Sequence, residues 1–439
     1  MESTSGFLTL ENKSKPATST PRNTSSIADQ LLQRALRSSG AVLIEGPKWS
    51  GKTRTAQRTA KSVLIIQNPD KIKSYMQTAS IKPSLLLEGD TTRLLDEWQL
   101  APILWDAVRF IVDTRDKTGQ FILTGLAVPA DNLSSHTGTG RISRIKMRPM
   151  SLNESQDSSG SVSLQDLFQS PVEIAGTSSI EIEQLADILV RGGWPASIHM
   201  SSNIAEKNVR DYVDAVINQD ISRVDFVEKS PEKVRTLMRS IARNVSTEAA
   251  LTTLRNDLEG KDESISMPTI SSYMNALERI FVIEDLPAWN PALRSKTPLR
   301  TTPKRHFVDP SIATAVMGIS HKRLLEDFNT FGYLFESLCI RDLRVYADSL
   351  DGNVYHYRDK TGLESDAVLV LRDGSWAAVE VKMGADEFDS AAKNLKKFVN
   401  RINTEKMQEP SFLLILSATE HAYRRKDGVY VAPLGCLKP

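Results

Sequence analysis

The sequence predicts an α/β protein in which a parallel sheet forms the core of the first half. Short aliphatic runs at 41–44 and 121–123 have the length and composition of buried parallel strands. The segment 53–60 lacks Pro and Gly, and the segment 102–115 has Pro at its start, so both are predicted helices. A glycine-containing turn joins the first strand to the first helix. Strands that alternate with helices in this way are typical of parallel sheets.

That turn, residues 46–53, matches the phosphate-binding pattern of two glycines separated by four residues and followed by Lys and Thr. Its glycines let successive N–H groups point into one concavity, and the following helix adds its partial positive charge. We expect Lys52 to contact the β- and γ-phosphates of ATP and the Thr53 hydroxyl to hold Mg²⁺. The alternative, an ordinary turn before a helix, is disfavoured by the flanking strand and helix. The predicted nucleotide contacts are Gly46, Pro47, Lys48, Trp49, Ser50, Gly51, Lys52 and Thr53.

An acidic pair, Asp96 and Glu97, follows a short aliphatic stretch downstream of the P-loop. We expect Asp96 to orient a Mg²⁺-bound water and Glu97 to polarise the water that attacks the phosphate. A pair of acids that caps a helix is the alternative. The position of the pair after the P-loop, and before another helix and strand, favours the catalytic interpretation.

Two further polar residues are candidates for the same site. Thr124 ends the strand at 121–124, where a polar side chain can sense the nucleotide, although a simple strand-end cap is the alternative. Arg141 follows Gly138 and Gly140 and could contact a γ-phosphate of the same chain or of a neighbouring chain in a homo-oligomer. The alternative for Arg141 is a solvated strand face.

Composition limits the classes of partner. The 439 residues carry 55 basic and 54 acidic side chains and a net charge of +1, so no global field attracts nucleic acid or a membrane. The two cysteines, Cys339 and Cys436, fit no metal-site spacing. The first residues lack a secretory signal pattern, and the aliphatic run 412–416 is too short to span a bilayer. We therefore expect a cytoplasmic protein without a membrane partner.

These motifs resemble those of prokaryotic ATPases that join an AAA-type domain to an uncharacterised C-terminal domain. The resemblance implies an ATPase core that uses ATP and Mg²⁺. Leu126 departs from it, because relatives usually have a small polar residue at this position. The segments that carry the resemblance are 46–53, 95–98, 121–125, 136–141, 147–152 and 192–195, together with the C-terminal third.

The same reasoning divides the chain into five predicted parts. They are a tail at 1–25, an AAA-type P-loop ATPase core at 26–152, a helical lid and linker at 153–245, a winged-helix-like domain at 246–320 and a nuclease-like domain at 321–439. Within the lid and linker, the Ser-rich stretch 153–180 is predicted to be a loop or insertion.

The segment 287–308 suggests a nucleic-acid contact, because it contains no acidic residue. A basic wing on DNA phosphates is one interpretation, and a structural wing packed on the ATPase is the alternative. The basic residues of the segment are Arg294, Lys296, Arg300, Lys304 and Arg305.

The C-terminal third contains a second candidate site. Asp366 begins a predicted strand, and Glu380 and Lys382 lie two residues apart on the next, so all three can reach one sheet face. This arrangement resembles the restriction-endonuclease (PD-(D/E)xK) fold, which implies Mg²⁺ held by Asp366, Glu380 and Glu336 of the preceding helix, with Lys382 stabilising charge. Ser365 stands where many such nucleases have proline. The alternative is an inherited fold without cleavage activity.

Together these features predict an ATP-hydrolysing protein that acts on DNA or RNA and has a metal-dependent nuclease site. The alternative is a nucleotide-dependent switch whose C-terminal domains bind protein partners and cut nothing.

Overall fold

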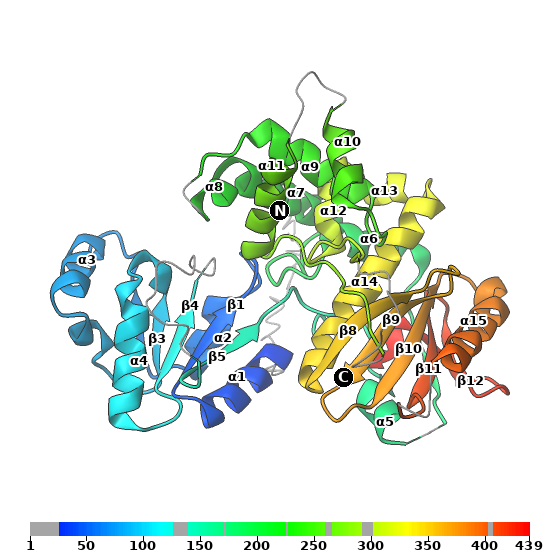
Figure 1. The fold of residues 1–439 in the computed structure, drawn as a ribbon, viewed down its shortest axis with the longest axis horizontal. Helices are drawn as coiled ribbons and strands as arrows, with labels where there is room; N and C mark the ends of the chain where they lie inside the picture. Colours follow the sequence, from blue (N-terminus) through cyan, green and yellow to red (C-terminus); the bar gives the residue numbers. More distant parts are fainter. Residues whose placement is uncertain are drawn as a thin grey trace, which may run out of the picture.

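The computed structural model describes residues 26–125, 139–170, 173–224, 227–259, 266–291, 302–402 and 407–439. Figure 1 shows three parts: a blue and cyan sheet with its helices, a green group of helices above, and a yellow-to-red sheet with its helices. Within the described ranges, no helix is both long and apolar enough to cross a membrane.

The first sheet is the parallel core that the sequence predicts. Its strand order is β2 (Ser62–Ile65), β3 (Arg93–Asp96), β4 (Phe121–Thr124), β1 (Ala41–Glu45) and β5 (Ile142–Lys146), and every neighbouring pair is parallel. In this register Thr124 is level with both Ile44 and Asp96, so the carboxyl ends of β1, β4 and β3 lie at one edge. The accompanying helices are α1 (Ile27–Ser38), α2 (Lys52–Thr59), α3 (Ile72–Ile81) and α4 (Ile103–Arg115).

The second strand in the chain, β2, is only partly buried. Because β2 is the edge strand, Val63 and Ile65 are each 41% exposed, and only Leu64 faces the core. In α4, the apolar side chain of Ile103 is 48% exposed, whereas Trp105 is buried. Local hydrophobicity therefore identified the elements but not which face is covered.

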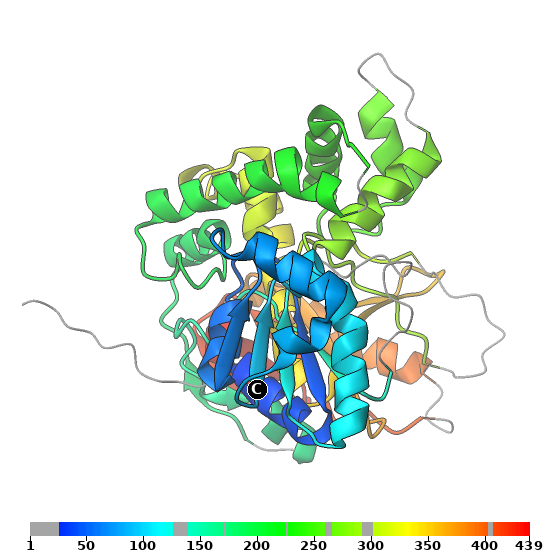
Figure 2. The same cartoon turned by 90° about the vertical axis from the view of Figure 1, so that its left-hand side faces the viewer.

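Helices dominate the middle of the chain, and Figure 2 shows them above the first sheet. One segment, η3, is a π-helix that continues α7 directly into α8. The elements are α6 (Ile182–Arg191), α7 (Ser202–Ala215), η3 (Val216–Asp220), α8 (Ile221–Arg223), α9 (Pro231–Arg243), α10 (Leu251–Glu259), α11 (Met267–Arg279), α12 (Pro310–Met317) and α13 (His321–Leu324).

Antiparallel bridges follow α10 and α11 and join Ile283 to Phe307 and Leu286 to Lys304. These pairings are isolated bridges and not extended strands. Two helices followed by such a pairing are compatible with the winged-helix prediction, which stays a prediction.

A seven-stranded mixed sheet forms the third part. Its order is β7 (Gly176–Thr177), β12 (His421–Arg424), β13 (Tyr430–Pro433), β11 (Phe412–Ser417), β10 (Trp376–Lys382), β9 (Glu364–Leu371) and β8 (Gly352–Arg358). Alternate residues of β9 face opposite cores: Leu369 packs in the cluster that contains α14 (Phe328–Ser349), and Val368 packs in the cluster that contains α15 (Phe388–Arg401). This period of two is what a strand covered on both faces requires.

The Ser-rich stretch 153–180 is not the loop that the sequence predicts. It contains β6 (Val162–Ser163), α5 (Leu164–Gln169) and β7, and β7 extends the edge of the C-terminal sheet by pairing with β12. Strand β6 pairs with the last strand, β14 (Leu437–Lys438). The stretch therefore packs with the C-terminal sheet, and its pairing partners lie too far along the chain for local patterns to reveal.

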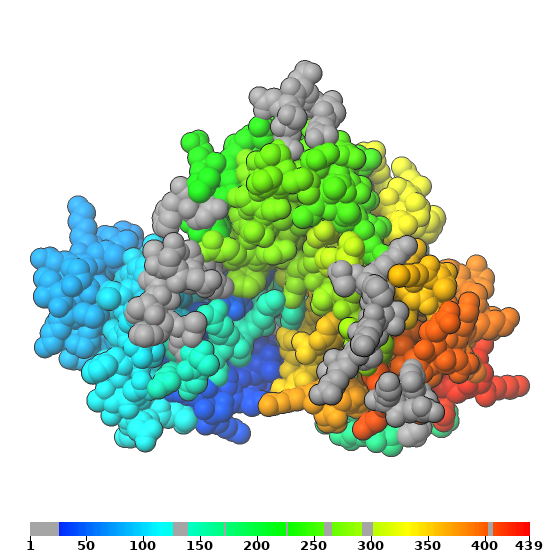
Figure 3. Space-filling view, viewed as in Figure 1, coloured from blue at the N-terminus to red at the C-terminus, as the bar shows by residue number. Residues whose placement is uncertain are grey.

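Ion pairs join the three parts, which lie against one another in Figure 3. Arg34 of α1 contacts Asp351 at 2.8 Å, which connects the first part to the third. Arg148, just after β5, contacts Glu284 at 2.7 Å and also pairs with Asp348 of α14. A single arginine thus connects all three parts.

Candidate functional site

The P-loop glycines occupy positions that a side chain could not. Gly46 has φ +146°, and a Cβ there would lie 2.0 Å from the carbonyl oxygen of Met147. Gly51 has φ +97° and directly precedes α2. Both backbone conformations favour glycine, so the loop shape depends on these two residues.

Lys52 is folded against its own loop. Its Nζ donates to the carbonyl oxygens of Gly46 at 2.7 Å and Pro47 at 2.6 Å. Burial lowers the pKa of Lys52 to about 8, although Glu97 and Asp96 act in the opposite direction. The Ser50 hydroxyl also donates to Pro47 at 3.0 Å, which ties the loop to itself.

The predicted Mg²⁺ residues meet at the carboxyl edge of the first sheet. Asp96 Oδ1 accepts hydrogen bonds from Thr53 Oγ1 at 2.8 Å and from Thr124 Oγ1 at 2.6 Å. Mg²⁺ prefers oxygen ligands, and one hydroxyl and one carboxylate within hydrogen-bond reach are a donor set that fits it. Thr124 therefore contacts the carboxylate that the sequence predicts as a metal ligand.

Glu97 has a left-handed backbone, with φ +58°. Its Oε2 accepts a hydrogen bond from Gln99 Nε2 at 2.5 Å. Burial raises the pKa of Glu97, while the Gln99 hydrogen bond lowers it. Gln99 is a residue that the sequence reasoning missed, and the only available signal was a polar side chain two positions after the acid.

Arg141 does not join this group. It lies just before β5, whose Ile142 is level with Ala41 at the amino end of β1, and it pairs with Asp113 at 2.8 Å. The P-loop leaves the opposite end of β1, roughly 13 Å farther along the strand. The expected contact with the γ-phosphate of the same chain is therefore wrong for this geometry, and contact with a neighbouring chain stays a prediction. Gly138 lies outside the described residues.

Two P-loop residues face the helical part. Lys48 Nζ lies 2.6 Å from Asp220 Oδ1, at the end of η3. The ring of Trp49 lies 5.4 Å from that of Tyr212 on α7. Their predicted role is to contact nucleotide, but in this structure they contact α7 and η3.

The C-terminal candidates lie close together. Asp366 Oδ2 accepts a hydrogen bond from the backbone N–H of Val381, which lies between Glu380 and Lys382 on β10. Lys382 Nζ lies 3.2 Å from Glu380 Oε2, and Asn394 donates to Glu380 Oε1 at 2.6 Å. Burial raises the pKa of Glu380 to about 8, and Asp366 adds to this effect.

A lysine occupies the place between the other two carboxylates. Lys304 Nζ lies 2.7 Å from Glu336 Oε1 and 3.2 Å from Asp366 Oδ1, and Lys304 is only 5% exposed. Burial opposes ionisation of Asp366, but Lys304 and Lys382 outweigh it and lower the pKa of Asp366. Because an ammonium neutralises this pair, the cluster does not fit a divalent cation that uses Glu336 and Asp366 together.

This finding also corrects part of the predicted basic wing. Lys304 and Arg305 are buried, and the Arg305 guanidinium pairs with Asp285 and donates to the carbonyl of Ala249 at 2.9 Å. Neither side chain is free to contact DNA. The remaining three basic residues, Arg294, Lys296 and Arg300, lie outside the described residues.

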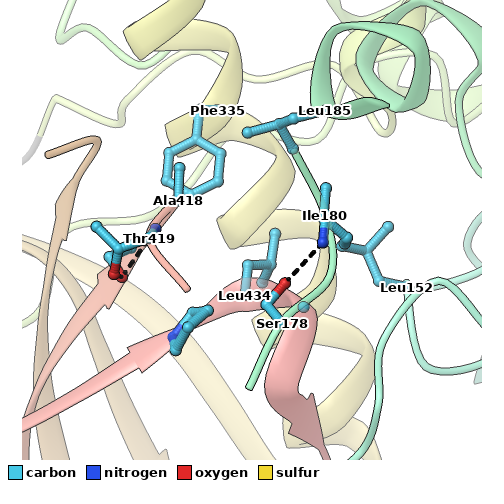
Figure 4. Close-up of a pocket in the computed structure, with 11 residues that line it drawn as sticks. Leu152, Ser178, Ile180, Leu185, Phe335, Ala418, Thr419 and Leu434 are labelled. Atoms are coloured by element: carbon cyan, nitrogen blue, oxygen red, sulfur yellow. Dashed lines mark hydrogen bonds between the residues drawn. The ribbon is translucent and has the colours of Figure 1, made fainter. Parts of the chain in front are cut away.

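The cavity in Figure 4 offers little room for a ligand. It lies between Leu185 of α6, Phe335 of α14 and Leu434 after β13, and its volume is about 10 Å³. Such a volume holds one water molecule at most.

Matches to protein-family models follow the three parts. Residues 38–156 match an AAA domain, residues 182–323 match a domain of unknown function (DUF8612), and residues 331–437 match another (DUF4143). Two curated relatives are the uncharacterized proteins Rv2008c of Mycobacterium tuberculosis and Mb2031c of Mycobacterium bovis. Each is 23% identical over 349 residues, which cover 77% of this chain and 70% of the relative.

Two solved structures have weak overall similarity. The Walker-type ATPase PABY2304 of Pyrococcus abyssi is 14% identical, with a TM-score of 0.40 over 66% of this chain and 94% of its own. A DNA replication initiation factor is 14% identical, with a TM-score of 0.26 over 58% of this chain and 87% of its own. These scores are too low to support an inference. The family match and the parallel sheet with its P-loop instead identify residues 38–156 as an AAA-type domain with a P-loop ATPase fold.

Proposed function

We propose that this protein binds ATP with Mg²⁺ at residues 46–53 and hydrolyses it. The observation that carries the proposal is the convergence of Thr53, Asp96 and Thr124 through two hydrogen bonds, with Glu97 adjacent. All of these groups lie at the carboxyl edge of a parallel sheet, where open α/β folds bind their ligands.

Each side chain has a role that follows from its position. Bound Mg²⁺ would be held by Thr53 and Asp96 and would neutralise phosphate charge. Lys52 would exchange its hydrogen bonds to the loop carbonyls for bonds to phosphate oxygens. Glu97 would accept a proton from the attacking water, and its raised pKa makes it a better base. Gln99 would orient Glu97 through their hydrogen bond.

We further propose that the C-terminal part acts in a nucleotide-dependent switch and does not cleave nucleic acid. The position of Lys304 between Glu336 and Asp366 supports this choice over the predicted metal-dependent nuclease. Binding of DNA or RNA is a second candidate function, and it depends on Arg294, Lys296 and Arg300.

The experiment that tests the ATPase proposal compares two variants. Lys52→Ala should lose affinity for a fluorescent ATP analogue, because it removes the charge that contacts phosphate. Glu97→Gln should keep that affinity but hydrolyse ATP about 100-fold more slowly, because it lacks only the base. Glu88→Gln, a change of an exposed acid, is the matched control and should behave as wild type. Wild-type turnover in Glu97→Gln would remove Glu97 from the catalytic role.

A further inference from the structure

The contact between the P-loop and the helical part consists of the Lys48–Asp220 ion pair and the Trp49–Tyr212 ring contact, and we call it the loop–helix contact. We propose that nucleotide binding opens this contact, because phosphates and Asp220 compete for Lys48. The helical part, whose family has no assigned function, would thereby respond to nucleotide. This inference rests on the proposed function, since it requires nucleotide in the P-loop.

The acidic partner of the ion pair, Asp220, is buried in the helical part. The Asp220 side chain is only 2% exposed, whereas the Lys48 side chain is 35% exposed. A second cation near this carboxylate, Arg223, is 4.0 Å away and its side chain is 66% exposed. The acidic partner is therefore buried in the helical part, whereas its lysine partner is more exposed and belongs to the loop that would contact nucleotide.

The backbone that positions Asp220 is unusual. Asp220 is the last residue of η3, a π-helix between α7 and α8, and Val216 and Ile217 of the same segment are buried. π-Helical turns are rare and occur frequently at functional sites. The wider turn gives the Asp220 side chain a different direction from the one it would have on a continuous α-helix. In this direction its carboxylate contacts Lys48 of the P-loop.

The aromatic half of the contact continues into the helical part. Trp49 has φ +66°, which is costly for a residue other than glycine, and its ring packs on Tyr212. Tyr212 packs on Trp194 at 4.8 Å, and Trp194 Nε1 donates to Ser311 of α12 at 2.9 Å. A change in the conformation of Trp49 would thus act on α7 first and on α12 through Trp194.

The negative charge of ATP determines whether nucleotide binding weakens or strengthens the Lys48–Asp220 ion pair. ATP brings several negative charges into the loop that contains Lys48, so the phosphates attract Lys48 and repel the nearby Asp220. Binding free energies are reciprocal: if nucleotide weakens the ion pair, the ion pair must weaken nucleotide binding by the same factor. Removal of the Asp220 charge should therefore strengthen nucleotide binding.

The test measures the affinity of the full-length chain for a fluorescent ATP analogue. Asp220→Asn should bind the analogue about fivefold more tightly than wild type or better. Lys48→Met should bind more weakly, and Asp220→Asn should give a smaller gain in the Lys48→Met background, where only the repulsion between Asp220 and the phosphates is removed. Asp214→Asn, which changes an exposed acid on α7, is the matched control and should leave affinity unchanged.

A second measurement covers the case in which Asp220→Asn fails to fold. Hydrogen exchange of residues 202–223 should increase when ATP is added to wild type, and Lys48→Met should show the increased exchange without ATP. Unchanged affinity in folded Asp220→Asn, or ATP-independent exchange in wild type that binds ATP, would overturn the proposal. Wild type that fails to bind ATP would instead overturn the proposed function, and this proposal with it.

Discussion

Lys304 forms a buried ion pair with Glu336 at 2.7 Å, across 32 residues of sequence. One side chain from the predicted DNA-binding wing thus neutralises an acid from the predicted metal site. The two sequence predictions cannot both use these residues as expected.

Lys304→Met should strongly destabilise the protein. Removing one partner of a buried ion pair leaves an uncompensated charge, which costs about 3–5 kcal/mol of the free energy of unfolding. Urea unfolding measures this loss. Lys396→Met is the control: the side chains of Lys396 and its partner Asp427 are 43% and 32% exposed, so the loss of this pair should cost about 1 kcal/mol or less.

The same cluster should not bind divalent cations. Calorimetric titration of wild type with Mn²⁺, in the absence of nucleotide, should give the same weak signal as titration of Asp366→Asn. Stoichiometric binding that disappears in Asp366→Asn would restore the nuclease interpretation.

Stability should fall as the pH rises from about 5 to 8, in part because of Glu380. Burial raises the pKa of Glu380 from its ordinary 4.5 to about 8, so in this window the folded chain holds a proton that the unfolded chain has released. The folded state therefore binds more protons, and stability decreases with pH. Glu336, whose pKa burial raises to about 7, contributes in the same direction.

Glu380→Gln should reduce this slope, because glutamine cannot ionise and can still accept the hydrogen bond from Asn394. The expected difference is on the order of 1–3 kcal/mol between pH 5 and pH 8, measured as urea unfolding at several pH values. Glu420→Gln changes an exposed acid and should keep the wild-type slope. An identical slope in Glu380→Gln would show that Glu380 ionises normally.

If the chain binds nucleic acid, the triple replacement of Arg294, Lys296 and Arg300 by Ala should weaken binding similarly for all sequences. It should also reduce the salt dependence of binding: the slope of the logarithm of the binding constant against the logarithm of the salt concentration should change by about 1 for each lost phosphate contact. Fluorescence anisotropy with labelled DNA and RNA at several salt concentrations measures both effects. Replacing exposed Lys73, Lys82 and Lys117 is a control of equal charge. Absence of wild-type binding at low salt would favour a protein partner.

Local sequence was sufficient to predict the strand, turn and helix of the candidate nucleotide site. The strand, turn and helix of the P-loop are adjacent in the chain, so their pattern predicts Lys52 and Thr53 directly. Asp96 and Thr124 end neighbouring parallel strands, and parallel strands align their carboxyl ends. Burial was not predictable in the same way: Lys304 stands among basic residues in the sequence, and only the fold brings Glu336 and Asp366 to it.

The pairing of β6 with β14 has a consequence for synthesis of the chain. Next to this pairing, the Ser158 hydroxyl donates a hydrogen bond to the carbonyl oxygen of Leu437 at 2.6 Å, and these two residues are 279 positions apart in the sequence. During synthesis, β6 is therefore made long before its partner strand β14, and the two strands cannot pair until residues 437–438 have been added. A fragment that starts at α14 would lack β6 and β7 and would leave β12 as an open sheet edge, which invites aggregation. The pairing of β6 and β7 with the C-terminal strands is thus completed only after those strands have been synthesised.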